Sequence, residues 1–112
     1  MDVTIEQIAG VTVVVLPGRD LDAGNAGEFK SAIAPVLKAH SKMVFDLSQL
    51  RFIDSSGLGA FLSCLRQLST KGGELKLCGL SNQVYQTFEL VRMHRIFDIY
   101  STKSEAVQAF QP

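Results

Sequence analysis

The sequence lacks the features that mark several large classes of protein. It has no tryptophan, only three prolines and only two cysteines, and its eleven basic residues are balanced by eleven acidic ones. A general nucleic-acid-binding protein needs an excess of basic residues to neutralise phosphates, so direct binding to nucleic acid is not expected. No apolar run approaches the roughly 18–20 residues that cross a bilayer, so no membrane span is expected either.

The two cysteines give no sign of a metal site. Cys64 and Cys78 fall in an expected helix and an expected strand, without histidine or cysteine partners at metal-ligand spacing. Buried, reduced thiols are favoured over a disulfide, and neither a metal nor a cofactor is expected. Residues 1–6 do not begin a basic region followed by a long apolar one, so they do not resemble a signal peptide. The expected location is the cytoplasm.

The composition is that of an ordinary globular protein, with 46% hydrophobic and 20% charged residues among the 112. This length predicts one domain, residues 1–112, large enough for a two-layer core. The sequence contains no internal repeat, low-complexity run or interdomain linker.

The hydrophobic pattern predicts strands that alternate with helices. A hairpin opens the chain, with its first strand at a sheet edge, and Pro35 predicts a kink or a break in the first helix. An α/β fold follows, with a mixed, mostly parallel sheet of about five strands and about four helices. The expected strands are residues 3–8, 11–16, 43–47, 74–78 and 96–100. The expected helices are residues 26–39, a segment from Leu58 to Gly72-Gly73, one capped by Ser81 and one opened by Thr102.

The most informative stretch is residues 45–59, FDLSQLRFIDSSGLG. An apolar strand runs into a short connection, and Asp54, Ser55 and Ser56 then stand where a helix begins. Polar groups at such a junction are exposed at little cost and lie near free helix N–H groups. A phosphate on a serine there would change the local charge by roughly −2. The stretch is therefore a candidate switch rather than a candidate active site.

A nucleophilic hydrolase would need a base beside Ser55 or Ser56. The only histidines are His40, at the end of the first helix, and His94, in a loop beyond the third helix. Neither is placed near the serines by sequence, and no Gly-x-Ser-x-Gly motif is present. We therefore expect no catalytic residues and a protein that is not an enzyme.

Gly57 and Gly59 raise the possibility of a phosphate-binding loop. The Walker spacing with its lysine is absent, and so is a full dinucleotide fingerprint. Two glycines at a strand-to-helix turn more often permit close backbone packing. That interpretation is favoured, and nucleotide binding stays open.

Three carboxylates, Asp20, Asp22 and Asp54, invite a metal or an acid–base interpretation. Turn-making and helix capping are favoured from composition alone, and residues 20–25 form a polar loop suited to cap the next helix. Asp22 follows the second strand and Asp54 the third. If those strands are neighbours, both loops open at the same end of the sheet. Ser55 would then lie beside an acidic pair, and phosphorylation would bring like charges together.

Two motifs, the element order and the length resemble those of the sulphate-transporter and anti-sigma-factor-antagonist (STAS) domain family. Residues 54–59, DSSGLG, resemble its phosphorylation-site signature, and residues 18–22, GRDLD, resemble its glycine-to-aspartate loop after the second strand. The resemblance covers essentially the whole chain. It is greatest for the free-standing bacterial anti-sigma-factor antagonists, which implies a single STAS-type domain.

The resemblance implies a switch in transcription regulation, as in bacterial stress responses. In this family the unphosphorylated antagonist binds an anti-sigma factor that is also a serine kinase, and the sigma factor is released. The kinase phosphorylates and ejects the antagonist, and a metal-dependent serine phosphatase restores it. By position in the motif, the phosphoacceptor is Ser55 rather than Ser56. The implied partner-facing residues are Asp20, Asp22, Asp54, Ser55, Ser56, Gly57 and Leu58.

One departure from the family pattern lies after the third helix. Family members often carry Gly-Leu there, and this chain has Arg92-Met93. Together with His94 and Arg95, this substitution bears on which partner is chosen. The alternative function is a STAS binding module without the switch, in a transport, lipid-trafficking or scaffold complex. Self-association stays open, although the edge strand near Ile5 has an apolar surface that could pair.

Overall fold

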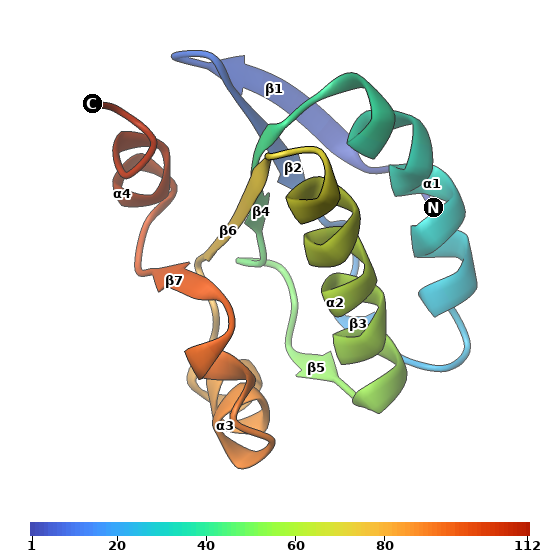
Figure 1. The fold of residues 1–112 in the computed structure, drawn as a ribbon. Coiled ribbons are helices and arrows are strands. Elements are labelled where there is room, and N and C mark those ends of the chain that lie inside the picture. Colours follow the sequence, from blue (N-terminus) through green and yellow to red (C-terminus); the bar gives the residue numbers. More distant parts are fainter.

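Runs of valine and other apolar residues build the centre of a five-stranded sheet. The computed structural model describes residues 1–112, and its strand order is β1-β2-β4-β6-β7 (Figure 1). β1 pairs antiparallel with β2, and the remaining neighbours are parallel. The predicted mixed sheet, with the hairpin as its antiparallel edge, is confirmed. The strands are β1 (Thr4–Ile8), β2 (Val11–Val15), β4 (Lys42–Asp46), β6 (Glu74–Cys78) and β7 (Asp98–Tyr100).

The four predicted helices are present and cover both faces of the sheet. They are α1 (Ala26–Ala39), α2 (Ser55–Thr70), α3 (Asn82–Leu90) and α4 (Lys103–Gln108). Figure 1 shows α1 and α2 on one side of the sheet, α4 on the other side, and α3 at the lower end. None of these helices has the length and apolarity that a membrane-crossing helix requires.

Two short strands were not predicted. β3 (Asp20–Leu21) and β5 (Phe52–Ile53) pair in parallel as a separate small sheet, with Asp20 opposite Phe52 and Leu21 opposite Ile53. The sequence predicts loops for both segments, because a two-residue strand is too short to show a hydrophobic period. They pair because Leu21 and Ile53 are buried side by side, at 1% and 2% exposure.

Two further predictions about elements are corrected. α1 continues through Pro35, so of the predicted kink or break the break does not occur. The proline lies on the exposed side, while Ile33 and Val36 on either side of it are buried and hold both halves of the helix on the sheet. The last strand covers only β7 and begins at Asp98 rather than at residue 96, because the 3-10 helix η1 (Met93–Arg95) is followed by a turn and a bend at Ile96 and Phe97.

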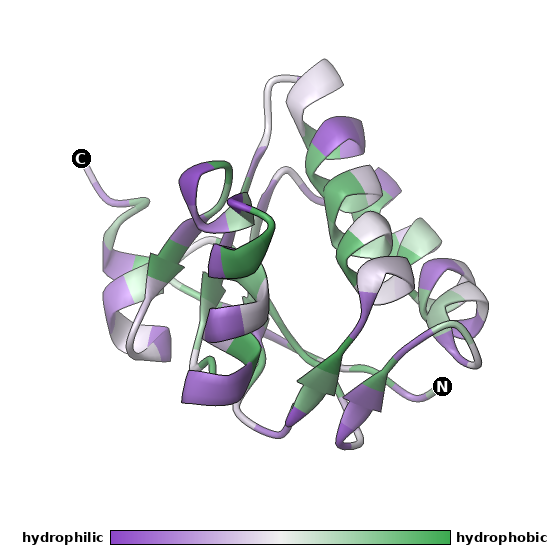
Figure 2. Ribbon diagram, turned by 90° about the horizontal axis from the view of Figure 1, so that it is seen from below, coloured by the Kyte–Doolittle hydropathy of each residue, from purple (hydrophilic) through white to green (hydrophobic).

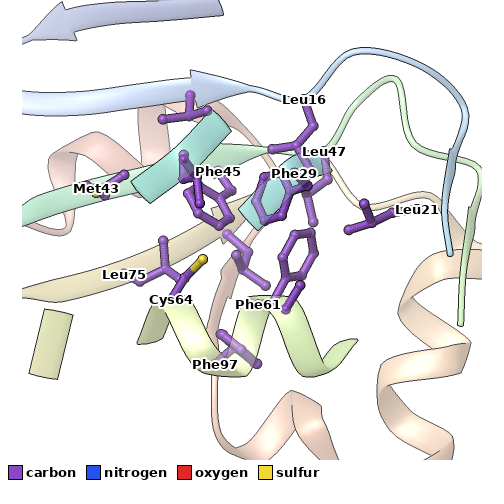
Figure 3. Packing of buried hydrophobic residues seen from close by; sticks show 14 of the residues in the cluster. Leu16, Leu21, Phe29, Met43, Phe45, Leu47, Phe61, Cys64, Leu75 and Phe97 are labelled. Atoms are coloured by element: carbon purple, nitrogen blue, oxygen red, sulfur yellow. The ribbon is translucent and has the colours of Figure 1, made fainter. Parts of the chain in front are cut away.

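The main core lies between the sheet and helices α1, α2 and α3 (Figure 3). Phe29, Phe45 and Phe61 meet at its centre with ring centroids 5.5 to 5.8 Å apart. Figure 2 shows the same division by colour, with apolar residues on the inner sides of the helices and polar residues outside. A smaller apolar cluster fills the other face beneath α4 and includes Val11, Val13, Val44, Cys78, Ala106 and Val107.

The thiols and the helix ends follow the sequence predictions. Cys64 and Cys78 are free and buried, and burial raises the pKa of both thiols to about 12. The Ser81 hydroxyl accepts from the Val84 N–H, and the Thr102 hydroxyl accepts from the Glu105 N–H and donates to the Glu105 carboxylate, so Thr102 caps α4 but the reciprocal bond of a capping box is not made. Gly72 has φ +78° just after α2, the left-handed conformation that ends a helix most easily at glycine.

Candidate functional site

Two loops that are far apart in the sequence meet at one end of the sheet. β2 and β4 are parallel neighbours, so the loops that follow them open at the same end, as predicted. The Arg19 carbonyl accepts from the N–H groups of Arg51 and Phe52, at 2.7 and 3.0 Å. The Asp54 N–H donates to the Leu21 carbonyl at 3.2 Å. The small β3–β5 sheet therefore fixes the position of one loop against the other.

Asp54 joins these loops to the first turn of α2. Its Oδ1 accepts from the N–H groups of Ser56 and Gly57, at 2.9 and 3.1 Å, which makes it the N-cap of the helix. Its Oδ2 accepts from the Ala23 N–H at 3.2 Å, across the gap to the other loop. The capping role favoured from composition is confirmed for Asp54. Its carboxylate also occupies the position where a helix N-terminus attracts an anion.

The loop between β3 and α1 is held by its own polar side chains. Asp22 Oδ1 accepts from the Gly24 N–H at 2.9 Å, the turn-making role favoured for this residue. The Asn25 side chain accepts from the Asp22 N–H and donates to the Asp20 carbonyl, at 2.9 and 2.8 Å. Asn25 stands at the N-cap of α1 but makes no capping bond with its side chain, so this loop caps no helix through a side chain. The loop is ordered instead as a rigid acidic turn.

Ser55 and Ser56 differ in their accessibility. Ser55 is the first residue of α2 and is exposed, whereas Ser56 is half-buried. The N–H groups of Ser56 and Gly57 are both taken by Asp54, so the Ser55 N–H is the donor of this turn that the carboxylate leaves free. A group attached to Ser55 would therefore project outward, beside the Asp54 carboxylate.

Close packing is required at Gly57 but not at Gly59. A Cβ at Gly57 would stand 2.7 Å from Ile53 Cγ1 and 2.7 Å from the Leu21 carbonyl oxygen, whereas one at Gly59 would meet nothing within 4 Å. Leu58, which the resemblance placed among the partner-facing residues, is only 4% exposed and belongs to the main core. Gly57 and Leu58 thus hold the first turn of α2 against the small sheet, and the exposed surface consists of their neighbours.

Phe52 is an exposed residue of this region that the sequence analysis missed. Its side chain is 44% exposed, although phenylalanine is usually buried. The alternation within β5 turns Ile53 inward and Phe52 outward, three residues before Ser55. Only the strand alternation of β5 shows that Phe52 faces outward. The sequence predicts a connection for residues 48–53, and a connection has no such alternation. Exposed aromatic residues are common anchors in protein interfaces.

The site is an exposed surface, and neither histidine belongs to its loops. His40 follows the last residue of α1, and His94 lies in η1 with its ring 6.2 Å from that of Tyr85. No three His, Cys, Asp or Glu residues are grouped so that they could hold a metal ion. None of the three hollows on the surface includes Phe52 or any residue from 19 to 25 or 54 to 58. Such a surface suits a macromolecular partner better than a small ligand.

Comparison with known proteins extends the similarity over the whole chain. The family model for the STAS domain matches residues 2–106. A Bordetella bronchiseptica protein with the provisional name anti-sigma factor antagonist BtrV is 32% identical over 112 residues, which cover 99% of this chain and 96% of that protein. The anti-sigma-B factor antagonist of Bacillus subtilis is 29% identical over 86 residues, 77% of this chain and 78% of that protein.

A solved structure agrees with the fold. The crystal structure of a Thermotoga maritima protein, provisionally described as an anti-sigma factor antagonist, superposes with a TM-score of 0.90 at 28% identity. The match covers 98% of this chain and 95% of that one. The predicted STAS-type fold, with a mixed five-stranded sheet and four helices, is confirmed.

Proposed function

The chain belongs to the STAS-domain family, and on that premise we propose that it is an anti-sigma-factor antagonist switched by phosphorylation of Ser55. The unphosphorylated form binds an anti-sigma factor that is a serine kinase, and the sigma factor is released. Phosphorylation ends the binding, and a serine phosphatase restores it. The observation that carries this proposal is Ser55 itself, an exposed hydroxyl at the first position of α2.

The charges around Ser55 explain how a phosphate acts as a switch. It adds a charge of roughly −2 beside the carboxylates of Asp54 and Asp22. Only the Ser55 N–H is left free by the Asp54 cap, so the phosphate gains less from the helix end than an uncapped terminus would offer. The added charge therefore faces outward, where a partner has to desolvate it. The fold need not change, because Ser55 has no packing role.

The size of the effect follows from interface energetics. A badly placed charge in an interface costs about 2–4 kcal/mol, which weakens binding roughly 30- to 1000-fold. The surface that is switched comprises Asp20, Asp22, Asp54, Ser55 and Ser56, extended by Phe52.

The chain is a binding domain, and its partners supply the chemistry of the switch. Residues 1–112 act as one STAS domain, and the chain catalyses no reaction. The kinase supplies the phosphoryl-transfer chemistry with ATP and the phosphatase supplies the hydrolysis. The protein works in the cytoplasm, where these partners and the sigma factor regulate transcription. The names of the relatives support this assignment at the level of the anti-sigma-factor antagonist.

The test compares three variants for binding to the host kinase and for phosphorylation by it. Ser55→Asp is expected to weaken binding at least roughly 30-fold, because it places a permanent charge at the switch. Ser55→Ala is expected to bind like the wild type and to accept no phosphate. Ser56→Ala is the matched control and should be phosphorylated normally. Phosphopeptides covering residues 52–66, from growing and stressed cells, report the state in the host.

Two results would contradict the proposal. One is equal binding by Ser55→Asp and Ser55→Ala, and the other is a Ser55 that carries no phosphate in any condition. Either would favour a STAS binding subunit without the switch, in a transport, lipid-trafficking or scaffold complex.

A further inference from the structure

A second exposed apolar surface lies at the end of α3. Five large hydrophobic side chains of the protein are exposed, and three of them fall within residues 90–96, which we call the 90–96 knob. Leu90 is 84% exposed, Val91 53% and Ile96 52%. Single exposed apolar residues are ordinary on a protein surface, but three within seven consecutive residues concentrate exposed apolar surface in one short segment.

The 90–96 knob is rigid. Phe88 before it and Phe97 after it are buried, and their rings meet edge-on at 5.8 Å. Backbone bonds fold the segment between them, from the Arg95 N–H to the Arg92 carbonyl and from the Ile96 N–H to the Met93 carbonyl, at 3.2 and 3.0 Å. Met93 packs against the main core. A surface held in one conformation loses little entropy when it binds.

Arg92 occupies a backbone conformation that favours glycine. Its φ is 60°, in the left-handed region, directly after the last turn of α3. This conformation is unfavourable for a residue with a Cβ, and glycine is the usual choice at such a position. The Arg92 side chain is exposed and takes part in none of the three ion pairs or the side-chain hydrogen bonds. The arginine thus makes no ion pair or side-chain hydrogen bond within the protein that would offset this strain.

The charge of the knob favours an acidic partner. Arg95 is also exposed and in no ion pair, so two exposed guanidinium groups without an ion pair lie between Val91 and Ile96 in the sequence. A symmetric contact with a second copy would bring four guanidinium groups together and is disfavoured. A membrane surface is disfavoured as well, because two cations on a chain of zero net charge attract anionic lipid only weakly.

We propose that the 90–96 knob is a second docking surface, for a protein partner that offers an apolar depression rimmed by carboxylates. This inference rests on the proposed function, in which that partner is the kinase-type anti-sigma factor. α3 packs against β5, which carries the exposed Phe52. In Figure 1 both elements lie at the lower end of the molecule, with the start of α2. On this proposal one partner contacts the switch and the knob together, and the arginines determine which partner is accepted.

The affinity test uses the purified host kinase that phosphorylates Ser55. The double variant Arg92→Gly, Arg95→Gln is expected to bind it at least about tenfold more weakly than the wild type. It should also lose part of the salt dependence of binding between about 50 and about 300 mM salt. Arg92→Gly alone should unfold at a higher urea concentration while it binds more weakly, because glycine relieves the left-handed strain. Arg66→Gln, an exposed arginine on α2, is the matched control and should bind like the wild type.

A cross-linking test does not depend on the kinase. A photoreactive phenylalanine replaces Leu90 in the host, and a control replaces Lys42, which is exposed at the other end of the sheet. Position 90 is expected to cross-link to an acidic segment of one protein, and position 42 is not. The inference is overturned if position 90 yields no protein, or if the double variant binds as tightly as the wild type. If the cross-linked protein binds Ser55→Asp normally, the proposed function fails and the docking surface stands.

Discussion

Gly57 is the residue at which the site tolerates the least change. It lies in the first turn of α2, where the helix touches both strands of the small sheet, and any side chain would collide with Ile53 and with the Leu21 backbone. Asp54 depends on this close approach, because it reaches both the Gly57 N–H and the Ala23 N–H. The position of Ser55 is therefore set by a neighbour that has no side chain.

Substitution by alanine should affect protein stability differently at the two glycines of the motif. Gly57→Ala is expected to lower the free energy of unfolding by about 1–3 kcal/mol, since backbone and a buried side chain have to move. Gly59→Ala has open space around it and should leave stability unchanged or raise it by up to about 1 kcal/mol. Urea unfolding of the two variants measures both. Equal effects would show that the first turn of α2 is not tightly packed.

At the scale of elements, α1 shows how packing overrides a local conformational preference. Pro35 removes one helix hydrogen bond and its ring crowds the carbonyl of Ser31. The helix persists because its apolar side is buried and because two of its C-terminal carbonyls accept from Lys71, the residue that follows α2. Lys71 Nζ donates to the carbonyls of Leu37 and Lys38 there.

Replacing this proline should therefore stabilise the protein. A proline inside a helix destabilises the folded state by about 3 kcal/mol. Proline also restricts the unfolded chain, which offsets up to about 1 kcal/mol of that loss. Pro35→Ala is accordingly expected to raise the free energy of unfolding by about 2 kcal/mol. Lys30→Ala, a change at another exposed position of α1, should stay within about 0.5 kcal/mol. Calorimetry compares the two, and a Pro35→Ala variant less stable than the wild type would contradict the account.

At the scale of the whole molecule, the two faces of the sheet are covered unequally by helices. Three helices lie over the main core, whereas the six-residue helix α4 alone covers the smaller cluster. Its attachment is assisted by Lys76, which donates to Asp98 at 3.1 Å and lies 4.8 Å from the centre of the Phe110 ring. The C-terminal side is therefore the side expected to open first.

The reactivities of the two cysteines measure the opening of the two faces of the sheet separately. Cys64 lies in the main core and Cys78 beneath α4, and burial raises the pKa of both thiols to about 12. At about pH 8 a thiol reagent should modify both at least about a thousandfold more slowly than in the unfolded chain. Cys78 is expected to react before Cys64, because α4 can open without the rest. Mass spectrometry of the labelled peptides gives the order, and faster labelling of Cys64 would contradict it.

The features that the sequence determined by itself are those set by local periodicity and local hydrogen bonding. The hairpin, α1 from Ala26 to Ala39, the caps at Ser81 and Thr102 and the junction at Asp54 all depend on residues within a few positions of one another. The adjacency of the Asp22 and Asp54 loops also followed, because the carboxyl ends of parallel neighbouring strands share one end of a sheet.

Tertiary structure alone decided the features that depend on distant partners. The pairing of β3 with β5 joins segments about thirty residues apart. No local hydrophobic period predicts this contact, because each strand has only two residues. That pairing turns Phe52 outward, and the packing of α2 buries Leu58. The left-handed Arg92 and the unbroken helix at Pro35 persist because buried neighbours on both sides hold the backbone in place. Local preferences at such positions are worth about 1–3 kcal/mol, which the burial of a few apolar side chains outweighs.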